Sequence, residues 1–82
     1  MKYEVLVADD HAIIRDGLRK ILADTDDLVV AGEAGNGNQA LEKVRERDWS
    51  MVVLDLSMPG RSGIELIKLM KAERPKLHPF SG

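Results

Sequence analysis

Three aspartates stand where two short apolar segments end. Asp9 and Asp10 follow the apolar residues 5–8, and Asp55 follows the apolar residues 51–54. If these segments are neighbouring parallel strands, their carboxyl ends meet at the edge where open α/β sheets bind ligands. Three carboxylates so close together repel one another unless a hard cation with oxygen ligands neutralises them. The pattern therefore predicts a Mg²⁺ site at that edge, although each acid alone would be interpreted as a helix cap or a solvated charge.

Alternating strand and helix patterns surround the acids. Short apolar runs rich in β-branched residues predict strands covered on both faces, at 5–8, 28–32 and 51–54. Helical spacing of apolar residues follows each strand, over 11–23, 39–47 and 64–73. This alternation implies right-handed crossovers and a parallel sheet, so the fold class is α/β with the order β-α-β-α-β-α. Residues 76–82 show neither pattern and are expected to form an irregular tail.

The first predicted helix is expected to bury one face and expose the other. Its apolar stripe consists of Ile14, Leu18, Ile21 and Leu22. Arg15 and Arg19 are expected on the solvated side, and Asp10 is expected as the N-cap. For the second helix, Asn36 or Asn38 is the expected cap.

Composition restricts the class of protein. A chain of 82 residues allows one small domain, and 44% hydrophobic with 32% charged residues is typical of globular proteins. A net charge of −2 gives no electrostatic reason to expect nucleic-acid binding or polybasic membrane binding. The chain has no cysteine and no apolar run near the roughly 20 residues that span a bilayer. A cytoplasmic location is therefore expected.

Several short motifs gather around the acids, at residues 8–11 (ADDH), 15–18 (RDGL) and 54–60 (LDLSMPG), with Gly63 and Glu65. Together they resemble the receiver domains of bacterial two-component response regulators. The likeness is strongest to the subfamily with a C-terminal helix-turn-helix output domain. It implies a flavodoxin-like, doubly wound parallel sheet with strand order 2-1-3, and a partial receiver domain over residues 1–75.

The resemblance also implies a role for each acidic residue. Asp55 is implied as the phosphoacceptor, which takes a phosphoryl group from a sensor histidine kinase. Asp10 is implied to bind Mg²⁺ directly and Asp9 to bind it through water, with Asp55 and the backbone carbonyl of Ser57 as further ligands. A carboxylate nucleophile gives a reactive acyl phosphate, and the cation neutralises charge on the phosphoryl group. The expected function is signal transduction in a transcriptional regulator, without enzymatic turnover.

The sequence departs from this family after the third helix. The family has five strands, with a Ser or Thr ending the fourth and a Lys ending the fifth. No Lys follows Lys76, and Ser81 is a disfavoured hydroxyl candidate because residues 77–80 are few and include Pro79. The chain is therefore expected to be a truncated fragment. Its third-strand edge and an uncovered apolar face are expected to favour self-association.

Two other functions remain open. Haloacid dehalogenase phosphatases also use an Asp at a strand end, but they need a second acid two residues later, where this chain has Ser57. The stronger alternative is a self-associating fragment whose site is vestigial and is not phosphorylated. His11 as a metal ligand is less favoured than a surface histidine. The glycines at 32, 35 and 37 fit turns better than a phosphate-binding loop.

Overall fold

The computed structural model describes residues 2–58 and 62–81, the last two by their backbone alone. Within these residues the elements are β1 (Tyr3–Ala8), α1 (Ala12–Ala23), β2 (Leu28–Ala34), α2 (Gly37–Glu46), β3 (Met51–Leu54), α3 (Gly63–Glu73) and β4 (Pro79–Ser81). All paired strands are parallel, and the order across the sheet is β2-β1-β3-β4. The predicted α/β class and the 2-1-3 order of the first three strands are confirmed.

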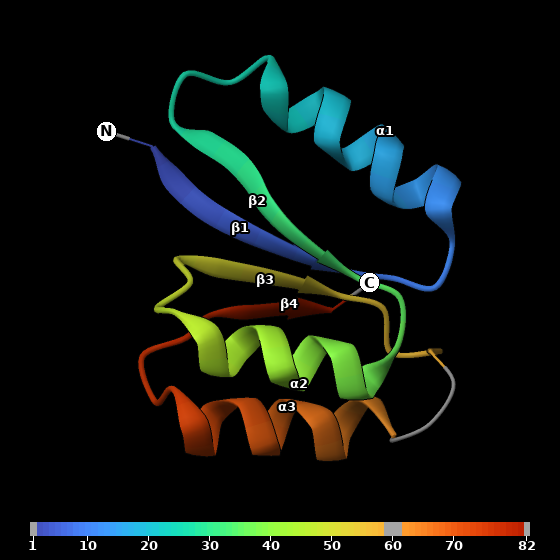
Figure 1. Ribbon diagram of the computed structural model, residues 1–82, viewed down its shortest axis with the longest axis vertical. Coiled ribbons are helices and arrows are strands. Elements are labelled where there is room, and N and C mark those ends of the chain that lie inside the picture. The colour runs from blue at the N-terminus through green and yellow to red at the C-terminus, as the bar shows by residue number, and fades with distance from the viewer. Residues whose placement is uncertain (1, 59–61, 82) are drawn as a thin grey trace.

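The helices lie on both faces of the sheet (Figure 1). The crossover from β1 to β2 runs outward and the crossover from β2 to β3 returns past β1. Because both crossovers are expected to be right-handed, the returning connection puts its helix on the opposite face. Accordingly, α2 and α3 lie side by side on one face, and α1 covers β1 and β2 on the other. No helix in the described part of the chain is long and apolar enough to cross a membrane.

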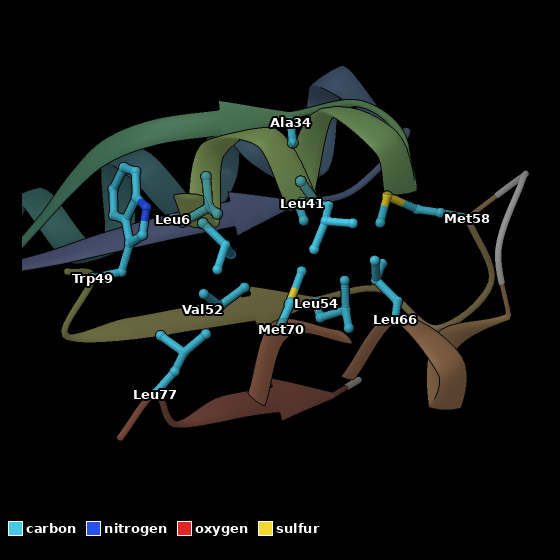
Figure 2. Close-up of a cluster of buried hydrophobic side chains, with 13 residues drawn as sticks. Leu6, Ala34, Leu41, Trp49, Val52, Leu54, Met58, Leu66, Met70 and Leu77 are labelled. Carbon is cyan, nitrogen blue, oxygen red and sulfur yellow. The ribbon is translucent and has the colours of Figure 1, made fainter. Parts of the chain in front are cut away.

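The larger core lies between the sheet and the layer of α2 and α3 (Figure 2). Side chains alternate along a strand, so every second residue of β1 and β3 points into this layer. The buried residues are Leu6, Ala8, Ala34, Ala40, Leu41, Val44, Trp49, Val52, Leu54, Met58, Leu66, Met70 and Leu77.

Trp49 closes the end of this core that lies away from the acids. Its indole Nε1 donates to the backbone carbonyl of Lys43 at 2.7 Å. A Cβ built on Gly32 would lie 2.6 Å from the Trp49 ring, so a side chain there would collide with the indole. Gly32 lies within β2, as the strand predicted over 28–32 requires, and the expectation of a turn at this glycine is wrong.

Helix α1 is packed less completely than the sequence predicts. Leu18 and Leu22 are half-buried, but Ile14 and Ile21 are 48% and 65% exposed. Among the described residues, no second helix lies beside α1 on its face of the sheet (Figure 1). The expected N-cap is also wrong. The chain stays extended through His11, which occupies the cap position in place of Asp10 and makes no side-chain cap hydrogen bond.

The other two helices begin at side-chain caps. Asn36 Oδ1 accepts a hydrogen bond from the backbone N–H of Gln39 at 2.8 Å, which selects Asn36 from the two predicted candidates. Ser62 Oγ accepts from the N–H of Glu65 at 3.1 Å. Each cap satisfies an amide that the first turn of a helix leaves unpaired.

The expected irregular tail over residues 76–82 is wrong for the part that forms β4. This strand runs parallel to β3, with Ser81 paired to Leu54, and Leu77 just before it is buried in the core. Pro79 is tolerated because it is the first residue of an edge strand. Since β3 now has a neighbour on each side, the predicted self-association through an exposed third-strand edge is also wrong. Ser81 is the last residue of this fourth strand. The receiver family has a Ser or Thr at that place, so the backbone position fits the disfavoured interpretation of Ser81 as that residue.

Candidate functional site

Hydrogen bonds between strand ends bring the acidic residues to one edge of the sheet. The backbone N–H of Asp9 donates to the carbonyl of Ala34 at 3.0 Å, and that of Asp55 donates to the carbonyl of Ala8 at 2.9 Å. Ala8 is in register with Leu54, so the residues that follow β1 and β3 are neighbours. The site therefore lies at the carboxyl edge, where the strand order reverses.

Three carboxylates and an imidazole form the cluster at this edge. Ligand atoms of Asp9, Asp10, His11 and Asp55 all lie within 4.8 Å of one another. Asp9 and Asp55 are half-buried, whereas Asp10 and His11 are exposed. The structure thus brings together the three acids that the sequence pattern places at matching strand ends.

His11 is exposed, as expected, and its imidazole lies against the acids of the cluster. Its Nδ1 is 2.9 Å from Asp9 Oδ1, 3.0 Å from Asp10 Oδ1 and 3.9 Å from Asp55 Oδ2. The hydrogen bond with Asp9 and the charge of Asp10 raise the pKa of His11 above 6.5. Its side chain is 63% exposed, so it reaches these partners from the solvent side. The imidazolium form supplies positive charge to a site crowded with carboxylates.

Asp55 is held in its ionised form by Ser57. The Ser57 hydroxyl and backbone N–H both donate to Asp55 Oδ1, at 2.7 and 2.9 Å. These two hydrogen bonds lower the pKa of Asp55 below 3.8, the side-chain bond having the larger effect. One carboxylate oxygen is therefore fixed by Ser57, and the other, Oδ2, faces His11.

The donor set fits Mg²⁺. All three acids offer hard oxygen ligands at a partly solvated edge, and Mg²⁺ usually takes one or two carboxylates together with water and phosphate oxygens. The ligand roles stay predictions: direct binding by Asp10 and Asp55, binding through water by Asp9, and binding by the backbone carbonyl of Ser57.

The loop after Asp55 passes close to the start of α3. A Cβ built on Gly63 would lie 2.8 Å from Leu56 Cβ and 2.9 Å from Leu56 Cα, so only glycine fits there without a shift. Glycine at position 63 therefore permits the close approach of this loop to α3. Residues 59–60, the end of the motif at 54–60, lie outside the described residues.

Two interactions at this edge were missed by the sequence analysis. The hydrogen bonds from Ser57 to Asp55 were overlooked, although an aspartate side chain commonly accepts from the backbone N–H two residues later. Arg15, predicted on the solvated side of α1, bonds to Glu33 and to the backbone of Asp9. No local signal predicts that contact, because it joins residues from two separate elements.

Comparison with known proteins identifies the family of this chain. The response regulator receiver domain family matches residues 5–79. The response regulator GacA of Pseudomonas syringae pv. syringae is 40% identical over 74 residues, which cover 90% of this chain and 35% of GacA. The nitrate/nitrite response regulator NarL of Escherichia coli K12 is 36% identical over 67 residues, covering 82% of this chain and 31% of NarL. The chain thus spans about a third of the length of these relatives.

Solved structures of response regulators share the fold of this chain. The isolated REC domain of RcsB from Salmonella enterica serovar Typhimurium, solved with the phosphomimetic BeF₃⁻, has a TM-score of 0.90 and 33% identity over 99% of this chain and 61% of its own. The response regulator domain of Thermotoga maritima CheB has a TM-score of 0.88 and 34% identity, with coverage of 99% and 61%. From its sequence match and its fold, this chain belongs to the response regulator receiver domain family.

Proposed function

We propose that Asp55 is a phosphoacceptor that takes a phosphoryl group from the phosphohistidine of a sensor histidine kinase, in a Mg²⁺-dependent transfer. The observation that supports this most strongly is the convergence of Asp9, Asp10 and Asp55 at the carboxyl edge of the sheet, with their ligand atoms within 4.8 Å. One acid at a strand end is common, whereas three at two adjacent strand ends repel one another, and a bound cation would balance their charge.

In this proposal the carboxylate of Asp55 is the nucleophile. Its lowered pKa keeps it ionised at neutral pH, and Ser57 holds Oδ1 so that Oδ2 is turned toward the cluster. A P–O bond to Asp55 forms as the P–N bond of the donor histidine breaks, which gives an acyl phosphate. Bound Mg²⁺ would neutralise charge on the phosphoryl oxygens. Asp10 would bind the metal directly, Asp9 through water and Ser57 through its backbone carbonyl.

We further propose that phosphorylation serves a cytoplasmic transcriptional regulator. GacA and NarL are response regulators, and RcsB has been solved bound to the promoter rprA. With a net charge of −2, this segment is not itself expected to bind nucleic acid, so an output domain would do so. The segment would act as a signalling module that is phosphorylated, without turning over a substrate of its own.

The test is intact-mass spectrometry after incubation with Mg²⁺ and the small phosphodonor acetyl phosphate. The chain should gain one phosphoryl group, and Asp55→Asn should gain none. Omitting Mg²⁺ or adding EDTA should abolish the adduct. A folded chain that gains no phosphoryl group would overturn the proposal and favour a vestigial site.

A second candidate function is self-association through the face that carries α1. An apolar groove of about 350 Å³ lies between α1 and β3, lined by Ile14, Leu18, Val53 and Leu54, with acids of the site at one end. Ile13, on the same helix, is 84% exposed. Exposed apolar surface of this kind favours pairing with another chain.

A further inference from the structure

Arg15 turns away from solvent toward the loop that bears the acids. It lies in the first turn of α1, and its side chain is only 22% exposed. Its Nη1 donates to the backbone carbonyl of Asp9, and its Nε donates to Glu33 Oε1 at 3.1 Å. Glu33 belongs to β2, where it pairs with Val7 of β1. The guanidinium group therefore joins α1, β2 and the end of β1.

The bond to the Asp9 carbonyl fixes one particular peptide unit. That carbonyl belongs to the planar group between Asp9 and Asp10. The N–H of Asp9 is already bonded to the carbonyl of Ala34 at 3.0 Å. With the backbone held on both sides of Asp9, the peptide plane cannot rotate freely. The position of the Asp10 Cα, from which its side chain leaves the backbone, is set as a result.

We propose that Arg15 is a positioning residue for the pair Asp9–Asp10, and that Glu33 holds Arg15 in place. This inference rests on the proposed function, because the expected task of the acid pair is to bind Mg²⁺. The geometry calls for arginine. Its planar group donates along two directions at once, which the ammonium group of lysine, a point charge on a flexible stem, does not reproduce.

The charge of Arg15 and its positioning role predict opposite changes in Mg²⁺ affinity when Arg15 is replaced. A guanidinium group near a cation site repels Mg²⁺, so removal of its charge would strengthen Mg²⁺ binding if long-range electrostatics were its only influence. Loss of positioning would weaken Mg²⁺ binding. The sign of the change in affinity therefore distinguishes the two roles.

The first measurement is a calorimetric titration of the full chain with MgCl₂. Residues that orient metal ligands typically change affinity by 10–100-fold, so Arg15→Gln should weaken Mg²⁺ binding by about tenfold. Arg15→Lys should recover only part of that loss. The matched control is Arg19→Gln, because Arg19 also lies on α1 and pairs with the other oxygen of Glu33. The described contacts of Arg19 do not include Asp9 or Asp10. The Mg²⁺ affinity of Arg19→Gln should therefore stay within about twofold of that of the unaltered chain.

The second measurement needs no metal. The backbone amide of Asp10 belongs to the same peptide as the Asp9 carbonyl, so its ¹H–¹⁵N NMR signal reports the bond from Arg15. That signal should move in Arg15→Gln and stay in place in Arg19→Gln, while the remaining dispersed signals show that each variant is folded. Arg15→Lys provides the milder variant if Arg15→Gln unfolds.

The two measurements separate the possible failures. An unchanged Asp10 amide in a folded Arg15 variant, or Mg²⁺ binding that is equal or tighter, would overturn the positioning role. If the unaltered chain binds no Mg²⁺, the proposed function of the site fails, and the Asp10 amide alone decides whether Arg15 holds the peptide.

Discussion

At Asp55, the two hydrogen bonds from Ser57 lower the carboxyl pKa and fix one oxygen. Replacing Ser57 by Ala removes the hydroxyl donor, which has the larger effect, and leaves the amide donor. The pKa of Asp55 should therefore rise in Ser57→Ala, as measured by ¹³C NMR titration of the carboxyl carbon. Ser50→Ala, at an exposed serine away from the site, should leave it unchanged. An unaltered pKa in Ser57→Ala would contradict this account of Asp55.

The same hydrogen bonds give stability a defined pH dependence. Because the folded-state pKa of Asp55 lies below 3.8, its ionised form stabilises the fold above that pH. This contribution is lost as the pH falls through the folded-state pKa. The difference in Tm between the unaltered chain and Ser57→Ala should therefore be present at neutral pH and shrink in acid below about 3.8. A difference in Tm that is constant across this range would argue against the linkage.

The pKa of His11 tests the charge balance of the cluster. It should lie above 6.5, because Asp9 accepts a hydrogen bond from the ring and Asp10 adds negative charge. Stability from this pairing is present below pH 6.5 and is lost as the pH rises through the folded-state pKa. Proton NMR titration of the ring should show a lower pKa in Asp9→Asn. An unchanged pKa of His11 in folded Asp9→Asn would contradict this explanation.

At the scale of elements, the approach of α3 to the loop after Asp55 depends on Gly63. The added methyl of Gly63→Ala would collide with the Cα and Cβ of Leu56. Overpacking of this kind typically costs 1–3 kcal/mol, so urea unfolding should show a loss of about 2 kcal/mol. The Asp55 amide signal should also shift, since Leu56 is its neighbour in sequence.

Gly17 offers a matched control, because it also lies in a helix. A Cβ built on it meets nothing within 4 Å. Alanine is favoured over glycine inside a helix by roughly 0.5–1 kcal/mol, so Gly17→Ala should stabilise the chain. Equal effects at the two glycines would contradict the packing explanation for Gly63.

Most elements of this fold could be predicted from local patterns, and the exceptions have physical causes. Apolar runs and helical spacing located the first three strands and the helices within a few residues, because burial imposes those patterns. The strand β4 was missed because a proline usually argues against a strand. The exception is a proline that is the first residue of an edge strand, as Pro79 is. Its position is set by Leu77 entering the core and by pairing with β3, which are tertiary contacts.

The site shows the same division. The convergence of Asp9, Asp10 and Asp55 was predictable because strand ends and strand order determine it. The hydrogen bonds of Ser57 had a local signal that was overlooked. The contact of Arg15 with Glu33 joins residues 18 positions apart on different elements, so side-chain geometry was needed to find it.

At the scale of the whole molecule, the two helical layers are unequal. One face of the sheet is covered by α2 and α3, whereas on the other only α1 is present among the described residues (Figure 1). Exposed apolar residues on α1 should make the 82-residue chain associate at high concentration, as measured by sedimentation velocity. Ile13→Glu should shift the chain toward monomer. Ile64→Glu, at an exposed isoleucine of α3, should not. A chain that stays monomeric would contradict this prediction.

The most direct test of the central claim is to locate the phosphoryl group after phosphorylation with acetyl phosphate. Borohydride reduces an acyl phosphate on aspartate to the alcohol of homoserine, whereas a phosphohistidine is not reduced in this way. Peptide mapping should find homoserine at position 55, and only in the sample that received both Mg²⁺ and phosphodonor. Modification at His11 or at another acid, or no homoserine in a folded chain, would contradict the assignment of Asp55 as the phosphoacceptor.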